Sequence, residues 1–481
     1  MKPCLELTVE KLVPGGLGLA RHEGEVILLP EALPGETVMV ELGERRKGVR
    51  RGRVVSVAKP SVWRTRPDCP WAARCGGCDF QHVRPEAALE LKSQAALGDL
   101  AEKAKVTLEL VESPLWERYR GRATLHLGLG GQGRLSVGFM PPRAEEGGVE
   151  KARDEPTLRS VVEFDDCRLL APELSGLIAP LRQWAGALAP DTPPVDLSLM
   201  LGAVGSGLTI FFSPPPFGPA GRKGGSRPKG PSPGQTASFR AALDRLPPAL
   251  ADHQSTLGLE DPLRSAPIAV FARTRPGGPP VKISPGGPDR LTAAHWPQWN
   301  LTLSAAPGGF TQVNPAVNRL MVEKILSLAD LTPSPGRPRE ALDLYSGLGN
   351  IALPLMKAGF AVTAVEQAPE SAAAARENAK GLAGFTFIND LSERAAAELA
   401  HRGRAFDLIV MDPPRAGAPR LAPTVAALNP RMIIYLACHP AVLTRDLPAL
   451  ASLGFRLRNL IALDMFPRTS HLEALAVLTP N

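Results

Sequence analysis

The sequence predicts an α/β protein whose C-terminal part is a Rossmann-like, doubly wound parallel sheet. After residue 338 short β-rich runs alternate regularly with Ala-rich helical segments, which indicates parallel strands joined by helices. The first 60 residues instead hold short β-rich runs between Pro-Gly turns, and the region between these two parts has poor periodicity. We therefore expect an N-terminal β-barrel (1–62), a mixed, β-rich central domain (63–300) and a C-terminal catalytic domain (301–481).

Length and composition set the broad class. A chain of 481 residues that is 44% hydrophobic can bury a sizeable core. No stretch approaches 18 uninterrupted apolar residues, and the N-terminus lacks a secretory pattern, so we expect a soluble, cytoplasmic protein without a membrane partner. The net charge of +7 permits a polyanionic partner without requiring one. Three of the six cysteines crowd between positions 69 and 78, which favours metal ligation in a reducing compartment over disulfides.

The N-terminal segment is expected to form a small five-stranded barrel of the OB type. β-Rich runs lie at 5–9, 25–29, 37–42 and 52–58. The last hairpin carries six cations within nine residues: Arg45, Arg46, Lys47, Arg50, Arg51 and Arg53. A solvated hairpin tip and a contact with nucleic-acid phosphates both agree with this charge.

Four cysteines are candidate metal ligands. Cys69, Cys75 and Cys78 lie on one tight loop, and Cys167 lies far downstream. Four thiolates suit either zinc or an iron–sulfur cluster, although a zinc ribbon usually pairs two short Cys-x2-Cys knuckles. Unrelated buried thiols are the alternative, and the spacing leaves the metal open.

The central region begins with a predicted helix at 85–103, followed by mixed β structure over 106–310. Segments 141–156, 214–235 and 275–289 interrupt it. The segment 214–235 is rich in Pro, Gly and cations and is expected to be a disordered insertion, either a solvated loop or a contact for RNA.

The C-terminal domain is predicted to contain seven strands, at 341–345, 361–366, 385–389, 406–411, 432–437, 457–463 and 472–478. The last two are expected to close the sheet as an antiparallel pair. Ligands of such sheets bind at the carboxyl ends of the strands, so candidate site residues are sought there.

The turn 343–350 after the first of these strands has the features of a cofactor loop. Gly347 and Gly349 let a ligand approach the backbone, and Glu366 at the end of the next strand can accept ribose hydroxyls. With Ala352 the loop also fits Gly-x-Gly-x-x-Ala, so a nicotinamide cofactor competes. An acidic residue four positions before the first glycine favours S-adenosylmethionine, which carries cationic groups where a dinucleotide carries pyrophosphate.

Two further strand ends carry reactive groups. Asp412-Pro-Pro-Arg415 forms a rigid corner, of a kind that amino-group methyltransferases use to hold a target amine, or else a structural turn. Cys438 ends a buried apolar run before Pro440, where a lone cysteine is more often a small core residue. Glu473, expected to be solvated on an edge strand, would complete a nucleophile and base pair with Cys438.

Together these motifs resemble the RNA uracil-5-methyltransferase family over nearly the whole chain. Within it, the branch that acts on 23S ribosomal RNA combines a TRAM barrel with an iron–sulfur cluster. The matching residues are Cys69 and Cys75-Gly-Gly-Cys78 with Gln81-His82, Cys167, Phe310-Thr-Gln312-Val-Asn314, 343–350, Asp412-Pro-Pro-Arg415, Cys438-His-Pro440, and Asp464-Met-Phe-Pro467 through His471-x-Glu473.

The resemblance implies an S-adenosylmethionine-dependent enzyme that methylates C5 of a uridine in RNA, and we expect the protein to be a monomer. It implies Cys438 as nucleophile and Glu473 as base. It implies a 4Fe–4S cluster on Cys69, Cys75, Cys78 and Cys167, and cofactor contacts at Gln312, Tyr345, Asn350, Glu366, Asp390 and Asp412. The chain departs from the family pattern at His439, where Asn is usual, and at Arg468, where His is usual.

Three alternatives remain at this point. Transfer RNA could replace 23S ribosomal RNA as the substrate. An amino-group methyltransferase would use the Asp412 corner and would not need Cys438. A non-catalytic iron–sulfur protein would bind RNA without transferring a methyl group.

Overall fold

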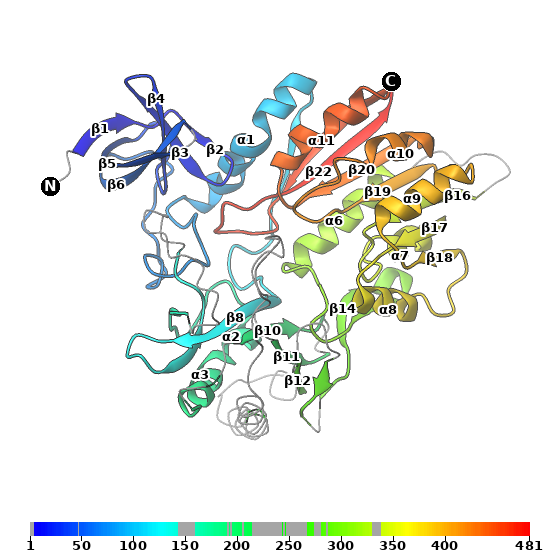
Figure 1. Ribbon diagram of the computed structural model, residues 1–481, viewed down its shortest axis with the longest axis horizontal. Helices are drawn as coiled ribbons and strands as arrows, with labels where there is room; N and C mark the ends of the chain where they lie inside the picture. Colours follow the sequence, from blue (N-terminus) through cyan, green and yellow to red (C-terminus); the bar gives the residue numbers. More distant parts are fainter. Residues whose placement is uncertain are drawn as a thin grey trace, which may run out of the picture.

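The computed structural model describes residues 4–46, 48–142, 159–189, 192, 195–203, 206–213, 243, 246, 267–273, 280–284, 287–329 and 338–481. Its three large sheets lie apart: the N-terminal sheet at the upper left of Figure 1, the central sheet at the bottom, and the C-terminal sheet at the upper right. The boundaries predicted at residues 62 and 300 stay a prediction. In the described part of the chain, no helix combines the length and apolar composition needed to cross a membrane.

The N-terminal sheet has six strands, in the order β1-β5-β6-β4-β3-β2, so the predicted five are wrong. They are β1 (Cys4–Thr8), β2 (Lys11–Val13), β3 (Leu17–His22), β4 (Glu25–Leu29), β5 (Thr37–Arg46) and β6 (Val49–Lys59). The sequence missed β2 because it is only three residues long, and β3 because a glycine interrupts its β-rich pattern. That glycine, Gly18, has the Ala32 carbonyl oxygen 2.9 Å from where a Cβ would be, so a side chain there would clash.

The basic hairpin between β5 and β6 is partly neutralised by carboxylates of its own sheet. Arg50 donates to Glu25 at 2.8 Å, and Arg45 lies 3.3 Å from the same carboxylate. Arg53 donates to Glu41 at 2.8 Å. Lys47 and the side chain of Arg46 lie outside the described residues. The hairpin therefore presents less net positive charge than its sequence indicates, and its contact with phosphates stays a prediction.

The predicted helix at 85–103 is present as α1 (Pro85–Ala104). Its Leu89, Leu97 and Ala101 share a core with the C-terminal sheet. The next strand, β7 (Leu108–Val111), pairs in parallel with β21 at the edge of that sheet. Its assignment to the central β region was therefore wrong, because its pairing partner lies about 350 residues away and leaves no local trace in the sequence.

The central sheet is mixed, as predicted, with the order β13-β12-β11-β10-β8-β9. Its elements are β8 (Arg122–Leu129), β9 (Leu135–Gly138), α2 (Pro172–Ser175), α3 (Ile178–Gly186), β10 (Asp196–Leu201), β11 (Leu208–Ser213), β12 (Ile268–Ala272) and β13 (Val281–Lys282). A separate hairpin follows, made of β14 (Leu291–Trp296), η3 (Pro297–Trp299) and β15 (Leu301–Ala305). The insertion 214–235 lies outside the described residues, as do parts of 141–156 and 275–289.

The C-terminal sheet has eight strands, in the order β18-β17-β16-β19-β20-β22-β21-β7. All seven predicted strands are present, and β21 and β22 form the predicted antiparallel pair. The strands are β16 (Arg339–Leu344), β17 (Phe360–Val365), β18 (Phe385–Ile388), β19 (Leu408–Met411), β20 (Met432–Ala437), β21 (Phe455–Leu463) and β22 (Glu473–Pro480). The helices are α6 (Pro315–Leu328), α7 (Ala352–Lys357), α8 (Pro369–Asn378), α9 (Ser392–His401), α10 (Ala422–Ala427) and α11 (Ala441–Ala451).

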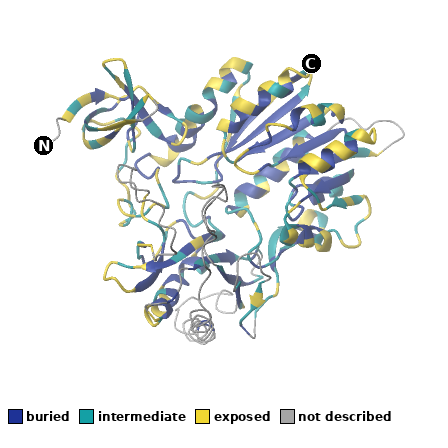
Figure 2. Ribbon diagram, viewed as in Figure 1, coloured by how far each residue is buried: buried dark blue, intermediate teal, exposed yellow. Residues whose placement is uncertain are grey.

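Helices cover both faces of this sheet, as in a Rossmann-like fold. Along β20, Ile433 and Tyr435 pack with α1, α9, α10 and α11, whereas Ile434 and Leu436 pack with α6 and α7. The central strands are accordingly buried on both faces (Figure 2). Ligands of such sheets bind at the edge formed by the carboxyl ends of the strands.

One buried cation joins α1 to the C-terminal sheet. Lys92 is 3% exposed and donates to the Asp464 carboxylate at 2.6 Å, and to the carbonyl oxygens of Phe466 and Thr469 at 3.2 and 3.3 Å. Burial lowers the pKa of Lys92, and the charge of Asp464 opposes this shift. The interaction therefore ties residues 464–469 to α1.

We predict that Lys92→Met lowers the free energy of unfolding by about 3 kcal/mol, because the Asp464 carboxylate would stay buried without its cation. Urea unfolding followed by circular dichroism measures this. Lys103→Met, on the exposed face of the same helix, is the matched control and should change stability by less than about 0.5 kcal/mol. The double variant Lys92→Met/Asp464→Leu should recover part of the loss. Equal free energies of unfolding for Lys92→Met and Lys103→Met would contradict the prediction.

Candidate active site

Four of the predicted site residues each come directly after a strand of the C-terminal sheet. Tyr345 follows β16, Glu366 follows β17, Asp412 follows β19 and Cys438 follows β20. These four strands are neighbours and run parallel, so their carboxyl ends lie at one edge of the sheet. The fold therefore brings together side chains that are up to 93 residues apart in the sequence.

Cys438 lies beside Glu473 because β22 runs antiparallel to β20. The last pair in this ladder is Ala437 with Ala474, so the next residue on each strand is Cys438 and Glu473. The prediction of a solvated Glu473 on an edge strand was wrong. Strand β22 lies between β20 and β21, and Glu473 is only 4% exposed. Cys438 is partly exposed, as a nucleophile must be, and its neighbour His439 is exposed.

The Cys438 thiol is held in its neutral form. Burial raises its pKa to about 11, and the nearby carboxylates of Glu473 and Asp412 add to this shift, while Arg415 opposes it. Burial also raises the pKa of Asp412 to about 6. The pKa of Glu473 is raised well above its usual value by burial and then by the charge of Asp412. The site thus contains a protonated thiol next to a carboxyl group that readily holds a proton.

Asp343, near the end of β16, was missed as a site residue. It is 1% exposed, and neither of its oxygens has a donor in hydrogen-bonding geometry among the described residues. Burial and the charge of Asp412 raise its pKa well above the usual value, and the backbone amide of Ala352 opposes this. Within the same described set, Ser346 Oγ and Glu473 Oε1 also lack a partner. In the sequence, the position of Asp343, four residues before the first glycine of the loop, served only to favour S-adenosylmethionine over a nicotinamide cofactor.

The loop after β16 is shaped for close approach of a ligand. Tyr345, Gly347 and Gly349 all have positive φ, at 62°, 58° and 92°. The Glu366 carboxylate fixes the loop, because it accepts from the backbone amides of Gly347 at 3.0 Å and Ala368 at 2.6 Å. Among the described residues other than Gly347 and its two chain neighbours, no atom lies within 4 Å of where a Cβ on Gly347 would be. Room is therefore left beside the loop.

The other predicted cofactor residues have identifiable partners. Asn350 exchanges two hydrogen bonds with Asn318 of α6, at 2.8 and 3.0 Å. The Tyr345 hydroxyl donates to Glu393 at 2.9 Å. Asp390 accepts from the Leu391 amide and from Arg394 near the start of α9, both at 2.6 Å, and Gln312 lies partly exposed between β15 and α6. Their roles as cofactor contacts stay predictions.

The charge of this edge discriminates between the two cofactors that the sequence left open. Asp343, Asp412 and Glu473 are buried or partly buried, and burial raises the pKa of all three. The charge of Asp412 raises the pKa of Asp343 and of Glu473 further. A cationic ligand would relieve this repulsion, whereas a pyrophosphate would increase it. This charge favours the cationic groups of S-adenosylmethionine over the pyrophosphate of a dinucleotide.

A second site lies between the N-terminal and central sheets. Cys69, Cys75, Cys78 and Cys167 line one cavity, together with aromatic side chains. Burial raises the pKa of Cys75 to about 11, and the charges of Cys167 and Cys69 add to it. Burial likewise raises the pKa of Cys78 and of Cys167. No group of three or more His, Cys, Asp or Glu residues in the described ranges is arranged to hold a single metal ion.

Comparison with solved structures supports the fold. The Pyrococcus abyssi tRNA (uracil-54, C5)-methyltransferase, solved with S-adenosyl-L-homocysteine, superimposes with a TM-score of 0.66. The match covers 99% of this chain and all of that one, at 22% identity. The predicted Rossmann-like fold is thereby confirmed.

Sequence comparisons identify the family. Residues 4–55 match the TRAM domain, and residues 299–480 match the tRNA (Uracil-5-)-methyltransferase model. The chain is 33% identical to the 23S rRNA (uracil(1939)-C(5))-methyltransferase RlmD of Shewanella amazonensis, over 98% of this chain and 95% of that protein. It is 32% identical to the enzyme of the same name from Alkalilimnicola ehrlichii, over 98% and 96%. With relatives of this similarity along its whole length, the chain belongs to the RNA uracil-5-methyltransferase family.

Proposed function

We propose that this protein transfers a methyl group from S-adenosylmethionine to C5 of a uridine in 23S ribosomal RNA. The observation that carries the proposal is Cys438 beside the buried Glu473, at the sheet edge where the other carboxylates gather. The two relatives named for 23S ribosomal RNA support the choice of RNA. Transfer RNA is the second candidate, because the matching family model and the Pyrococcus enzyme are named for it.

The cofactor would lie at the strand ends. Its ribose would meet Glu366, and its cationic groups would meet Asp343 and Asp412. Further contacts would come from Gln312, Tyr345, Asn350 and Asp390. When bound there, S-adenosylmethionine supplies the methyl group that uracil receives. The unpartnered oxygens of Asp343 support this placement.

The side chains of this chain would make C5 reactive and then remove its proton. C5 of uracil is a poor nucleophile, so the ring must first be activated. The Cys438 thiol loses its proton to solvent, and the thiolate sulfur bonds to C6 while the electron pair of the C5–C6 double bond moves to C5 and the C4 carbonyl. After C5 gains the methyl group, Glu473 takes the C5 proton. The C6–S bond then breaks, which restores the double bond and returns Cys438 as a thiolate. The raised pKa of Glu473 suits a carboxylate that must accept a proton.

The target base must leave its stack before this chemistry can occur. C6 is shielded in a stacked helix, so the uridine is flipped out or lies in a single strand. The TRAM domain and the cysteine loop would hold the surrounding RNA. We propose that the four cysteines bind a 4Fe–4S cluster in a structural role, since no step of the reaction needs electrons. Four thiols that line one cavity, together with the cysteine spacing, support this proposal.

Two other functions make different predictions. An amino-group methyltransferase built on Asp412 would stay active without Cys438. A non-catalytic protein would bind RNA and transfer no methyl group from labelled cofactor. The pairing of Cys438 with a buried carboxylate on a neighbouring strand disfavours both, because neither needs it.

The first test uses RNA that carries 5-fluorouridine. Fluorine cannot leave C5 as a proton does, so we expect a covalent complex between Cys438 and the RNA, visible on a denaturing gel. It should form with 23S ribosomal RNA and not with transfer RNA. Cys438→Ala should abolish it and lower methyl transfer to ordinary RNA by at least about 10³-fold. An undiminished complex with Cys438→Ala, or none with the wild type, would exclude the mechanism; a complex with transfer RNA alone would change the substrate.

The second test measures the pH dependence of Cys438 alkylation in the free protein. Because the pKa is raised to about 11, the thiolate fraction and the alkylation rate should rise about tenfold for each pH unit from about pH 8 to about pH 10. Mass spectrometry of the peptide that contains Cys438 follows the reaction with iodoacetamide. Glu473→Gln removes a negative charge and should shift the profile to lower pH, although burial keeps the pKa above its ordinary value. A rate that is constant above pH 8 would contradict the raised pKa.

The third test concerns the cluster. Anaerobically purified protein should contain about four iron and four sulfide per chain. Cys167→Ser should lose most of this iron, because it removes one of the four ligands. Cys4→Ser is the matched control, since Cys4 is an exposed thiol on β1, and its iron content should be unchanged. One zinc ion per chain, or equal iron in both variants, would contradict the cluster.

A further inference from the structure

Arg468 is a buried arginine in the loop between β21 and β22. The loop leads directly into Glu473, five residues further on. Arg468 is 3% exposed and has a left-handed backbone with φ of 63°. A non-glycine residue in this conformation must be held by its surroundings. A contact with RNA phosphates is excluded for a side chain buried in this way.

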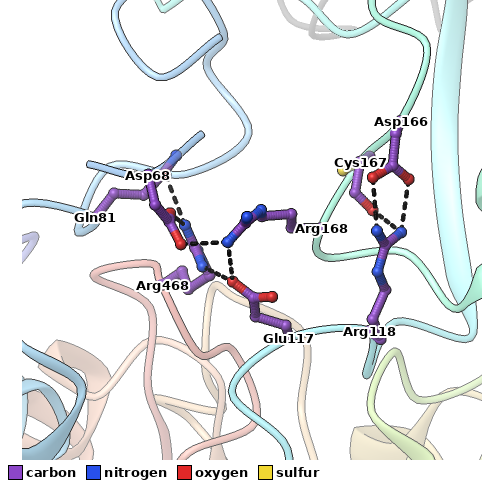
Figure 3. Close-up of polar contacts among 8 residues, drawn as sticks. All are labelled: Asp68, Gln81, Glu117, Arg118, Asp166, Cys167, Arg168 and Arg468. Atoms are coloured by element: carbon purple, nitrogen blue, oxygen red, sulfur yellow. Dashed lines mark hydrogen bonds and ion pairs between the residues drawn. The ribbon is translucent and has the colours of Figure 1, made fainter. Parts of the chain in front are cut away.

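The partners of Arg468 come from distant parts of the chain. Its guanidinium forms ion pairs with Asp68 and Glu117, and donates to the Gln81 side chain at 2.9 Å. Arg168 contacts the same two carboxylates (Figure 3). Arg168 and Arg468 therefore form one ion-pair network in which each arginine contacts both carboxylates.

The two arginines of this network, Arg168 and Arg468, line the four-cysteine cavity. Asp68 directly precedes Cys69, Arg168 directly follows Cys167, and Arg468 itself lines the cavity. On the far side of Cys167, Arg118 donates twice to Asp166 at 2.6 Å and to the Cys167 carbonyl oxygen at 3.1 Å. The positions of the cysteine backbone and of the Arg468 partners are thus linked.

The loop backbone is bound to the cysteine segment as well. The Phe80 amide donates to the Arg468 carbonyl oxygen at 3.1 Å. The Asp79 carboxylate accepts from the amide and the hydroxyl of Ser470 at 2.7 and 2.5 Å. Residues 79 and 80 directly follow Cys78. A shift of the cysteine segment must therefore shift the loop or break these bonds.

We propose that Arg468 is a positioning residue, which makes the placement of Glu473 depend on occupancy of the four-cysteine cavity. The inference rests on the proposed function and deepens it. A group bound by the cysteines fixes Asp68 and Arg168, these fix Arg468, and the loop then enters β22 with Glu473 beside Cys438. With the cavity empty, the buried guanidinium loses its fixed partners and the loop loosens.

Hydrogen–deuterium exchange on the full-length wild type tests this without any substitution. Removal of the bound metal with a chelator should speed exchange of the backbone amides in 466–472 by at least roughly tenfold. Amides of β17, far from the cavity, should not change. Unchanged exchange in 466–472 would overturn the coupling, as would a protein that purifies without bound metal. Neither result would affect the Cys438 chemistry.

Substitution of Arg468 gives a second, step-specific readout. Arg468→Lys keeps the charge but cannot reach both carboxylates with one planar group, and Arg468→His restores the residue usual in the family. If Glu473 is misplaced, proton removal slows while sulfur addition continues. A methylated covalent complex with ordinary uridine RNA should then accumulate, as in Glu473→Gln, and turnover should fall about tenfold or more.

The matched control is Arg182→Lys, because Arg182 is paired with Glu163 and Asp165 in the central domain and does not contact the loop. Its turnover and its exchange should resemble the wild type. Metal removal from the Arg468→Lys variant should lower turnover little further, because both changes act on Glu473 through Arg468. Additive losses, or lower turnover with no accumulated complex, would overturn the proposal. A missing complex with 5-fluorouridine RNA in the wild type would instead overturn the proposed function.

Discussion

The whole site depends on the confinement of negative charge at one edge of the C-terminal sheet. Asp343 and Glu473 are almost fully buried, and the charge of Asp412 raises the pKa of both. Buried carboxylates that repel one another destabilise the protein unless they bind protons or a cation neutralises their charge. Burial raises the pKa of the Cys438 thiol, and the charges of Glu473 and Asp412 add to this shift. Binding of a cationic cofactor would therefore change both the stability of this edge and the chemistry of the thiol.

The direction of a single strand decides which groups meet there. Strands β16 to β20 run parallel and bring only their carboxyl ends to this edge. Because β22 is antiparallel, its first residue lies at the same edge. A parallel β22 would have placed Glu473 at the opposite edge, about 20 Å away for a strand of this length. The antiparallel pair at the end of the domain is thus what joins a base to the nucleophile.

The sequence predicted those features that leave a local signal. Apolar runs located the seven strands of the C-terminal sheet, and the position after each run located Glu366, Asp412 and Cys438. The sequence could not predict that β7 joins the same sheet, because its partner β21 lies far along the chain. It also placed Glu473 on an edge strand, since strand order depends on pairings that no short motif encodes. Asp343 was not named as a contact residue because its burial is visible only in the assembled sheet.

The loop 464–472 shows why these distant pairings matter to function. Lys92 of α1, Tyr119 and Asp79 contact it, and Arg468 adds two carboxylates from segments more than 340 residues away in sequence. A buried guanidinium or ammonium is stable only while its partners are in place. The loop therefore takes its native conformation only when α1, the cysteine segment and the C-terminal sheet have assembled around it. Since Glu473 begins the strand that follows, the base is in position only in the fully assembled molecule.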